Sequence, residues 1–79
     1  MASFFVNLNL ISDINHFVNI ANAVDCEVTC KSGPYIVDGK SIMGLFSLDL
    51  SKSIGVVLDT DDPEIISKFD KYMVNQIVE

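Results

Sequence analysis

The chain has 79 residues, 11 of them acidic and only 5 basic, and its formal net charge is −6. A negative field repels the phosphates of nucleic acids and of anionic lipids, so this charge argues against nucleic acid and membrane partners. Because 49% of the residues are apolar and only 20% are charged, we expect one folded domain over residues 1–79. The chain has no apolar stretch long enough for a membrane span and no basic start of a signal peptide, which predicts a cytoplasmic protein.

The first elements predicted by the sequence are a strand and a helix. Apolar and polar side chains alternate over residues 3–8, as they do in a half-buried strand. Ser12 or Asp13 is then expected to cap a helix that runs to about Ala23. Apolar residues recur in this helix at the spacing of a single face, namely Ile14, Phe17, Val18 and Ala21.

A hairpin follows, and it contains both cysteines of the chain. Residues 26–32 alternate again, and a Gly-Pro pair separates them from a returning strand at residues 35–38. Cys26 and Cys30 are four strand positions apart, about 13 Å, which is beyond the reach of a disulfide. A zinc site needs further Cys or His ligands, and the chain has a single histidine. We therefore expect core cysteines, no metal and no cofactor.

The second half predicts a short helix, a strand and a last helix. Ser41 begins a helix of about two turns, and residues 54–58 alternate as a fourth strand. Asp62 caps the last helix with Pro63 in its first position. The expected apolar face of that helix is Ile65, Phe69, Met73 and Ile77, with Ile66 alongside.

Four alternating strands and three amphipathic helices can bury one another's apolar faces in an open-faced α+β sandwich. In this fold class the antiparallel sheet carries all the helices on one face and leaves the other face in water. The pattern alone does not fix the strand order, because a ferredoxin-like split unit gives nearly the same string of elements.

The segment from Lys40 to Leu48 reads Lys-Ser-Ile-Met-Gly-Leu-Phe-Ser-Leu. It resembles the regulatory-serine segment of HPr, the histidine-containing phosphocarrier family of the bacterial sugar phosphotransferase system. The family's segment reads Lys-Ser-Ile-Met-Gly-Val-Met-Ser-Leu, so the chain differs only by apolar exchanges at Leu45 and Phe46. The elements before and after the segment correspond as well, so the resemblance covers essentially the whole chain. It implies the HPr fold, with sheet order 1-4-2-3.

The chain departs from the family at the phosphoacceptor motif, His-x-Arg-Pro. The ungapped alignment places Leu10 at the histidine, Ser12 at the arginine and Asp13 at the proline. A leucine cannot attack phosphorus, and the exchange of an arginine for Ser12 beside Asp13 replaces positive with negative charge. We therefore expect neither phosphoryl-carrier activity at this position nor an enzyme.

The resemblance gives Ser41 a regulatory role. In the Gram-positive branch of the family a dedicated ATP-using kinase phosphorylates the matching serine, and the residues matching Ile42, Met43 and Phe46 form part of the docking patch. The alternative is that Ser41 is only a helix cap, worth about 1 kcal/mol, and that Met43 and Phe46 are core residues. Helical spacing places Met43 off the face of the other apolar residues, so at least one apolar side chain should be exposed.

Two functions remain open from the sequence. The first is a regulatory HPr-like module, similar to the catabolite-repression paralogue without the histidine. This module binds a protein partner through the Ser41 helix, either an HPr kinase, a transcription regulator or a metabolic enzyme. The second is a phosphocarrier in sugar uptake whose acceptor has moved to His16, which otherwise is an ordinary solvent-facing histidine. A small-molecule-binding domain of unrelated descent is a third possibility, against which the segment from Lys40 to Leu48 argues.

The oligomeric state is left open as monomer or dimer. The segment between the first strand and the first helix is several residues shorter than the family's active-site loop. Short connections disfavour folding back on the same chain, so strand exchange between two copies is a hypothesis for a dimer.

Overall fold

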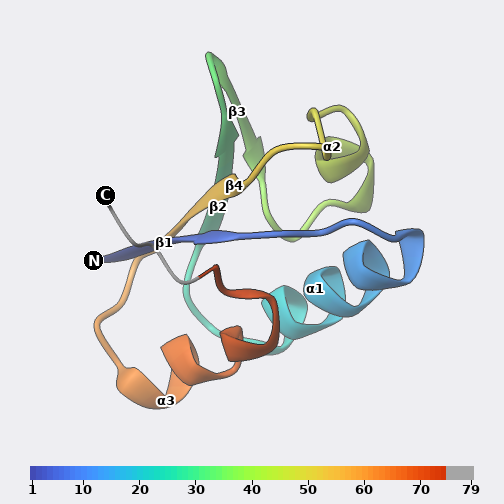
Figure 1. The fold of residues 1–79 in the computed structure, drawn as a ribbon. Coiled ribbons are helices and arrows are strands. Elements are labelled where there is room, and N and C mark those ends of the chain that lie inside the picture. Colours follow the sequence, from blue (N-terminus) through green and yellow to red (C-terminus); the bar gives the residue numbers. More distant parts are fainter. Residues whose placement is uncertain (75–79) are drawn as a thin grey trace.

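The computed structural model of the chain describes residues 1–74, and Figure 1 shows the arrangement of its elements. In chain order they are β1 (Ala2–Val6), α1 (Ile11–Ala23), β2 (Val28–Ser32), β3 (Tyr35–Asp38), α2 (Ile42–Phe46), β4 (Ile54–Leu58), α3 (Pro63–Ser67) and the 3-10 turn η1 (Asp70–Tyr72). This order of strands and helices confirms the predicted one, and β3 and β4 have the predicted bounds.

The four strands form one antiparallel sheet in the order β1-β4-β2-β3, which confirms the order implied by the family resemblance. β4 lies between β1 and β2, so Val56 pairs with Phe4 on one side and with Cys30 on the other. Since successive side chains of a strand point to opposite faces, all three of these residues face the helices. The fold is an α+β sandwich with one open face.

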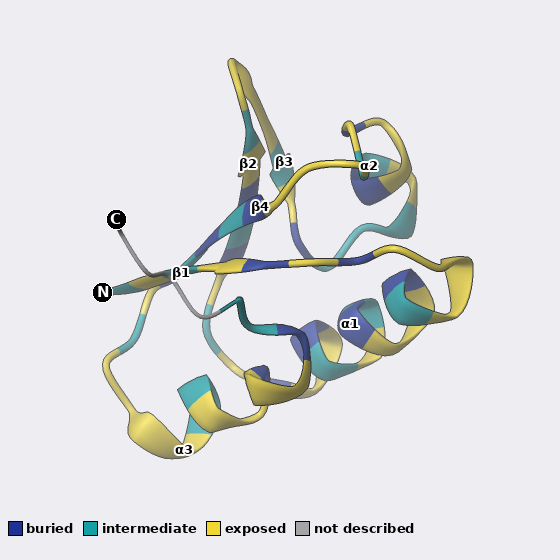
Figure 2. Cartoon of the chain, viewed as in Figure 1, coloured by how far each residue is buried: buried dark blue, intermediate teal, exposed yellow. Residues whose placement is uncertain are grey.

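The core lies between the sheet and the helices. Figure 2 shows buried residues along the strands and on the sides of the helices that face them. Phe69 joins the layers, because its ring centroid lies 5.8 Å from that of Phe4 on β1 and 5.3 Å from that of Phe17 on α1. Cys30 is fully buried, as predicted, whereas Cys26 is half-buried and precedes β2. The predicted start of that strand at Cys26 was two residues early.

The β2–β3 hairpin turns over two residues. Ser32 pairs with Tyr35, which leaves Gly33 and Pro34 as the turn. Gly33 has φ +60°, a value that favours glycine, and the ring of Pro34 fixes its own φ near −65°. This combination is that of a type II′ turn, whose twist matches that of the flanking strands.

The start of α1 corrects the prediction that Ser12 or Asp13 caps the helix. Leu10 is the N-cap residue, and the helix begins at Ile11. Asp13 is the third residue of the helix, and its carboxylate accepts the backbone N–H of Leu10 at 3.1 Å. Aspartate in the first turn satisfies a free donor there and suits the positive end of the helix dipole, which explains why a leucine can occupy the cap position.

The C-terminal segment also departs from the prediction, which continued the last helix through Met73 to Ile77. α3 ends at Ser67, and Met73 has extended backbone angles and pairs with Val6 of β1. The backbone N–H of Asn7 donates to the carbonyl of Tyr72 at 2.9 Å, and the N–H of Val74 donates to the carbonyl of Phe5 at 2.8 Å. These bonds satisfy the outer edge of β1, which a longer helix would leave unpaired. Ile77 lies outside the described residues.

Within residues 1–74, no helix has the length and apolar character that a membrane span requires. The same residues contain no group of three or more His, Cys, Asp or Glu side chains able to hold a metal ion.

Candidate functional site

Ser41 caps the helix that carries the predicted docking residues. Its Oγ accepts the backbone N–H of Gly44 at 3.1 Å, which satisfies one of the free donors of the first turn. Gly44 lets α2 approach β3 closely, because a Cβ on this residue would lie 3.2 Å from the Cβ of Val37. Leu45 is completely buried and anchors the helix to the core. The helix is therefore fixed to the sheet by one face only.

The other face of α2 presents apolar side chains to solvent. Met43 is 76% exposed and Phe46 is 44% exposed, while Ile42 is half-buried. These three residues are called the α2 surface below. The alternative in which Met43 and Phe46 are core residues is wrong, because both side chains are exposed. Leu45 is the residue of this helix that packs in the core. Exposed methionine and aromatic side chains are common at binding surfaces.

The positions that the sequence aligns with the family's phosphoacceptor motif lie at the start of α1. Leu10 is 62% exposed, and Ile11 beside it is 67% exposed. The carboxylate of Asp13 holds the N–H of Leu10. The start of α1 thus presents two apolar side chains and one negative charge in the segment that the sequence aligns with the family's motif. Ile11 was not among the predicted site residues, although an apolar residue at a helix start, outside the apolar face of the helix, is a usable signal.

His16 lies one turn further along α1 and is exposed, as predicted. Its Nδ1 is 2.9 Å from the hydroxyl of Tyr72, a buried residue of η1. Burial and the nearby carboxylate of Asp13 raise the pKa of Tyr72 above its ordinary value, so the phenol keeps its proton at neutral pH. The ammonium group of Lys71 lies 5.6 Å from the centroid of the same ring. Tyr72 was not among the predicted site residues, because the sequence pattern indicates a continuous helix over this segment.

A shallow pocket of about 380 Å³ adjoins His16. The remaining lining residues come from the outer side of α1 and from the end of α3, namely Asn19, Ile20, Ala23 and Lys68. Lys68 is the one lysine in this lining, whereas Asn19, Ile20 and Ala23 carry no charge. The pocket does not include Ser41, so the structure keeps the two candidate phosphoacceptors at different places.

Three comparisons with known proteins bear on these features. A family model described as "PTS HPr component phosphorylation site" matches residues 13–72. A search of curated proteins finds no match. Among solved structures, the crystal structure of HPr-C-His from Thermoanaerobacter tengcongensis is similar, with a TM-score of 0.76 and 20% sequence identity. That similarity covers 90% of this chain and 89% of the other, and at this identity it supports the fold alone.

Proposed function

The chain belongs to the HPr family of the phosphotransferase system, and we propose that it is a regulatory member that carries no phosphoryl group. On this proposal it acts by binding protein partners through the α2 surface, with Ser41 as the position at which a phosphate controls binding. The partners are an HPr kinase and either a transcription regulator or a metabolic enzyme. The protein is neither an enzyme nor a cofactor carrier, and it works in the cytoplasm.

The observation that carries the proposal is the contact between Asp13 and Leu10. A phosphoryl carrier needs a nucleophile, backbone donors for the phosphoryl oxygens and a positive side chain beside them. Leu10 provides no nucleophile, and the carboxylate of Asp13 already accepts the N–H of Leu10 at 3.1 Å. Ser12 aligns with the arginine and supplies no positive charge, and an incoming phosphoryl group would meet the like charge of the Asp13 carboxylate, which repels it. The start of α1 is therefore unsuited to phosphoryl transfer.

The α2 surface is the feature that supports partner binding. Met43 and Phe46 are exposed although both are apolar, and they share a helix whose other side is held by the buried Leu45. A phosphate on Ser41 would add about −1.5 to −2 charges next to these side chains. Its oxygens can accept the N–H of Gly44 that the hydroxyl accepts in the unmodified protein. Phosphorylation would thus change the charge of the docking surface and preserve the helix.

The first experiment tests whether the protein carries a phosphoryl group. The protein is incubated with phosphoenolpyruvate and the general enzyme of the phosphotransferase system, with an active HPr as the positive control. We expect no label on this protein while the control is labelled. An acid-labile label on the wild type would overturn the non-carrier proposal.

The second experiment tests Ser41 and the α2 surface together. With ATP and an HPr kinase we expect an acid-stable phosphate that is lost in Ser41→Ala. Met43→Asp keeps the hydroxyl but alters the docking surface, and it should lower the rate of phosphorylation about 10-fold. Tyr35→Asp is the matched control, because Tyr35 is 65% exposed on β3, and it should leave the rate unchanged. If the wild type takes up no phosphate, the regulatory role of Ser41 is wrong and the residue is only a helix cap.

The second candidate function is a phosphocarrier that uses His16. The observation that favours it is the bond between Nδ1 of His16 and Tyr72, which orients the ring and leaves Nε2 as the nitrogen available for transfer. Lys68 lines the pocket beside His16, and its ammonium group is able to stabilise the oxygens of a phosphoryl group during transfer. In this case the acid-labile label of the first experiment disappears in His16→Asn and persists in Ser41→Ala.

A further inference from the structure

The face of the sheet that carries no helix is a second candidate surface, separate from α2. Successive side chains of a strand point to opposite faces, so those that alternate with the core project away from the helices, and we call them the open face. Along β4 they are Gly55 and Val57, and Asp59 continues the alternation after the strand ends. Register places Phe5 and Lys31 on either side of Gly55. The middle of the open face therefore has a gap where Gly55 carries no side chain.

An apolar groove follows this gap. It has a volume of about 500 Å³, and its lining includes Phe5, Lys31, Gly55 and Val57. The Phe5 ring is 42% exposed at its wall. β1 and β2 lie two strand spacings apart, about 9.6 Å, which admits an extended chain but is narrower than a helix of about 10–12 Å. The groove thus fits an extended segment with an apolar side chain over Gly55.

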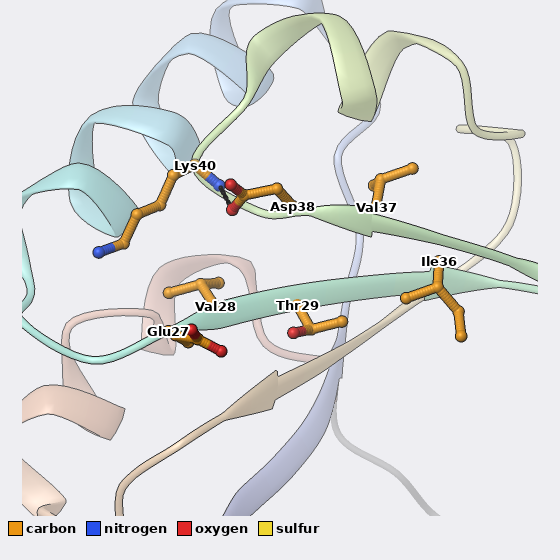
Figure 3. A pocket seen from close by; sticks show the side chains of 7 residues that line it. All are labelled: Glu27, Val28, Thr29, Ile36, Val37, Asp38 and Lys40. Atoms are coloured by element: carbon orange, nitrogen blue, oxygen red, sulfur yellow. Dashed lines mark hydrogen bonds between the residues drawn. The ribbon is translucent and has the colours of Figure 1, made fainter.

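The open face is acidic at the end where β4 stops and β2 starts. The backbone N–H of Asp59 donates to the carbonyl of Glu27 at 3.2 Å, so these residues are neighbours across the two strands. Asp38 lies opposite Thr29 in the register of β2 and β3. All three acidic residues are exposed. Figure 3 shows the side chains of Glu27 and Thr29 on the same side of β2, opposite to Val28.

A pocket of about 370 Å³ lies at this acidic end, and its lining includes Glu27, Thr29 and Asp38. Lys40 lines the pocket too, but its ammonium group donates to the carbonyl of Val24 at 3.0 Å. The carboxylate of Asp38 accepts the backbone N–H of Lys40 at 2.9 Å, as the dashed line in Figure 3 shows. Among the residues that line the pocket, no cation forms an ion pair with either carboxylate.

These charges determine the kind of partner that fits. At the open-face positions of the four strands, Lys31 is the only cation, and it lies at the hairpin end of β2. Glu27, Asp38 and Asp59 therefore outnumber it at the other end. Because like charges repel, this face disfavours a second copy of the chain, nucleic acid and anionic lipid. It favours a protein segment with positive charge.

We propose that the open face binds an extended segment of a basic partner protein. An apolar side chain of this segment lies in the groove over Gly55, and an arginine or lysine enters the pocket between Glu27 and Asp38. Strand spacing and rise place these two positions roughly 12–14 Å apart, which matches four residues of an extended chain. Lys31 repels a basic side chain from the other end of the groove and so fixes the direction of the segment.

A synthetic peptide with the required spacing tests the proposal. The peptide Leu-Ser-Val-Ser-Arg-Ser-Arg with blocked ends carries its first arginine four positions after the leucine. In an NMR titration at ~0.05 M salt it should shift the amide signals of Gly55, Val57 and Thr29, with a dissociation constant below ~1 mM. The isomer Arg-Leu-Arg-Val-Ser-Ser-Ser has the same charge and the wrong spacing, and it should bind at least ~5-fold more weakly. No shifts at ~5 mM peptide, or shifts centred on α2, would overturn the proposal.

A pair of double variants tests the acidic pocket. Glu27→Gln/Asp38→Asn removes both charges, keeps an acceptor for the N–H of Lys40 and should raise the dissociation constant at least ~10-fold. Glu64→Gln/Asp70→Asn is the matched control, because it makes the same change of net charge at exposed positions of α3 and η1. It should stay within ~2-fold of the wild type. Equal effects of the two double variants would mean attraction by net charge alone and would contradict a specific site.

Gly55→Val tests the groove separately by filling its floor. A Cβ there would lie 3.6 Å from Cε1 of Phe5, an ordinary contact, so we expect a folded variant that binds the peptide at least ~10-fold more weakly. Unchanged affinity in a folded Gly55→Val protein would overturn the proposed site, and if the variant does not fold, the double variants decide. Met43→Asp should leave the affinity unchanged, so neither result affects the proposed role of Ser41.

Discussion

The hydroxyl of Tyr72 lies 2.9 Å from Nδ1 of His16, and this hydrogen bond joins the C-terminal turn to the first helix across 56 positions of the chain. Tyr72 is buried and its backbone carbonyl also accepts the N–H of Asn7, so one residue contacts both α1 and the end of β1. These contacts lie where the sequence predicted a continuous helix, which in the structure ends at Ser67.

We first predict that Tyr72→Phe lowers the free energy of unfolding by about 1 kcal/mol, because the change removes one side-chain hydrogen bond and preserves the ring. Urea denaturation measures the effect. A double-mutant cycle with His16→Ala should give a coupling energy of about 0.5–1.5 kcal/mol. Tyr35→Phe is the control, since Tyr35 is exposed and makes no side-chain hydrogen bond among the described residues. Equal effects of Tyr72→Phe and Tyr35→Phe would contradict the prediction.

Second, the two thiols should differ in reactivity. Burial, with a smaller contribution from the charge of Asp38, raises the pKa of Cys30 to about 12, and a thiol is attacked through its thiolate form. Cys26 is half-buried outside β2. At pH 8 a thiol reagent should therefore modify Cys26 at least ~100-fold faster than Cys30 in the folded protein. The variant Cys26→Ser should retain only the slow thiol, and denaturant should make that thiol react fast.

Third, stability should fall at alkaline pH through Cys30. The thiol ionises near pH 9 in the unfolded chain but only near pH 12 in the folded protein, so the unfolded state loses its proton first. The stabilising contribution is complete below pH 9 and is lost as the pH rises from 9 toward 12, with a limiting slope of about 1.4 kcal/mol per pH unit. Cys30→Val should remove this component of the pH dependence. Identical slopes for wild type and variant would exclude the thiol as its source.

Fourth, Gly39→Ala should destabilise the protein by about 1–3 kcal/mol, because a Cβ at this position would lie 2.5 Å from Cγ1 of Val28. Gly55→Ala is the matched control on β4. The nearest atom to a Cβ there is Cε1 of Phe5 at 3.6 Å, an ordinary contact, so we expect a change of no more than about 0.5 kcal/mol. Thermal and urea denaturation of both variants decide the comparison, and a larger loss for Gly55→Ala would be the opposite of the expected order.

Fifth, the capping role of Ser41 can be separated from its proposed regulatory role. Ser41→Ala removes the acceptor of the Gly44 N–H and should cost about 1 kcal/mol of stability. Ser41→Asp keeps an acceptor at the cap and adds a negative charge, so it should be close to the wild type in stability. A stability of Ser41→Asp as low as that of Ser41→Ala would show that the carboxylate cannot take over the cap.

The sequence predicts those parts of the fold that local patterns determine. Alternation at residues 35–38 and 54–58 gives the exact bounds of β3 and β4, and the Ser41 cap begins α2 as expected. The path after α3 was not predictable, because Met73 continues the helical apolar pattern and yet pairs with Val6 at the other end of the chain. Likewise, no local signal indicates that Tyr72 lies beside His16. Contacts between distant segments decide both cases.

The pairing of Val6 with Met73 has a consequence for how the protein is made. β1 is synthesised first, but its inner partner β4 begins at Ile54 and its outer partner is at Met73. The outer edge of β1 therefore stays unpaired until the segment around Met73 has been synthesised. Because contacts of such sequence separation are slow to close, we expect the pairing of β1 to be a late step in the formation of the native sheet.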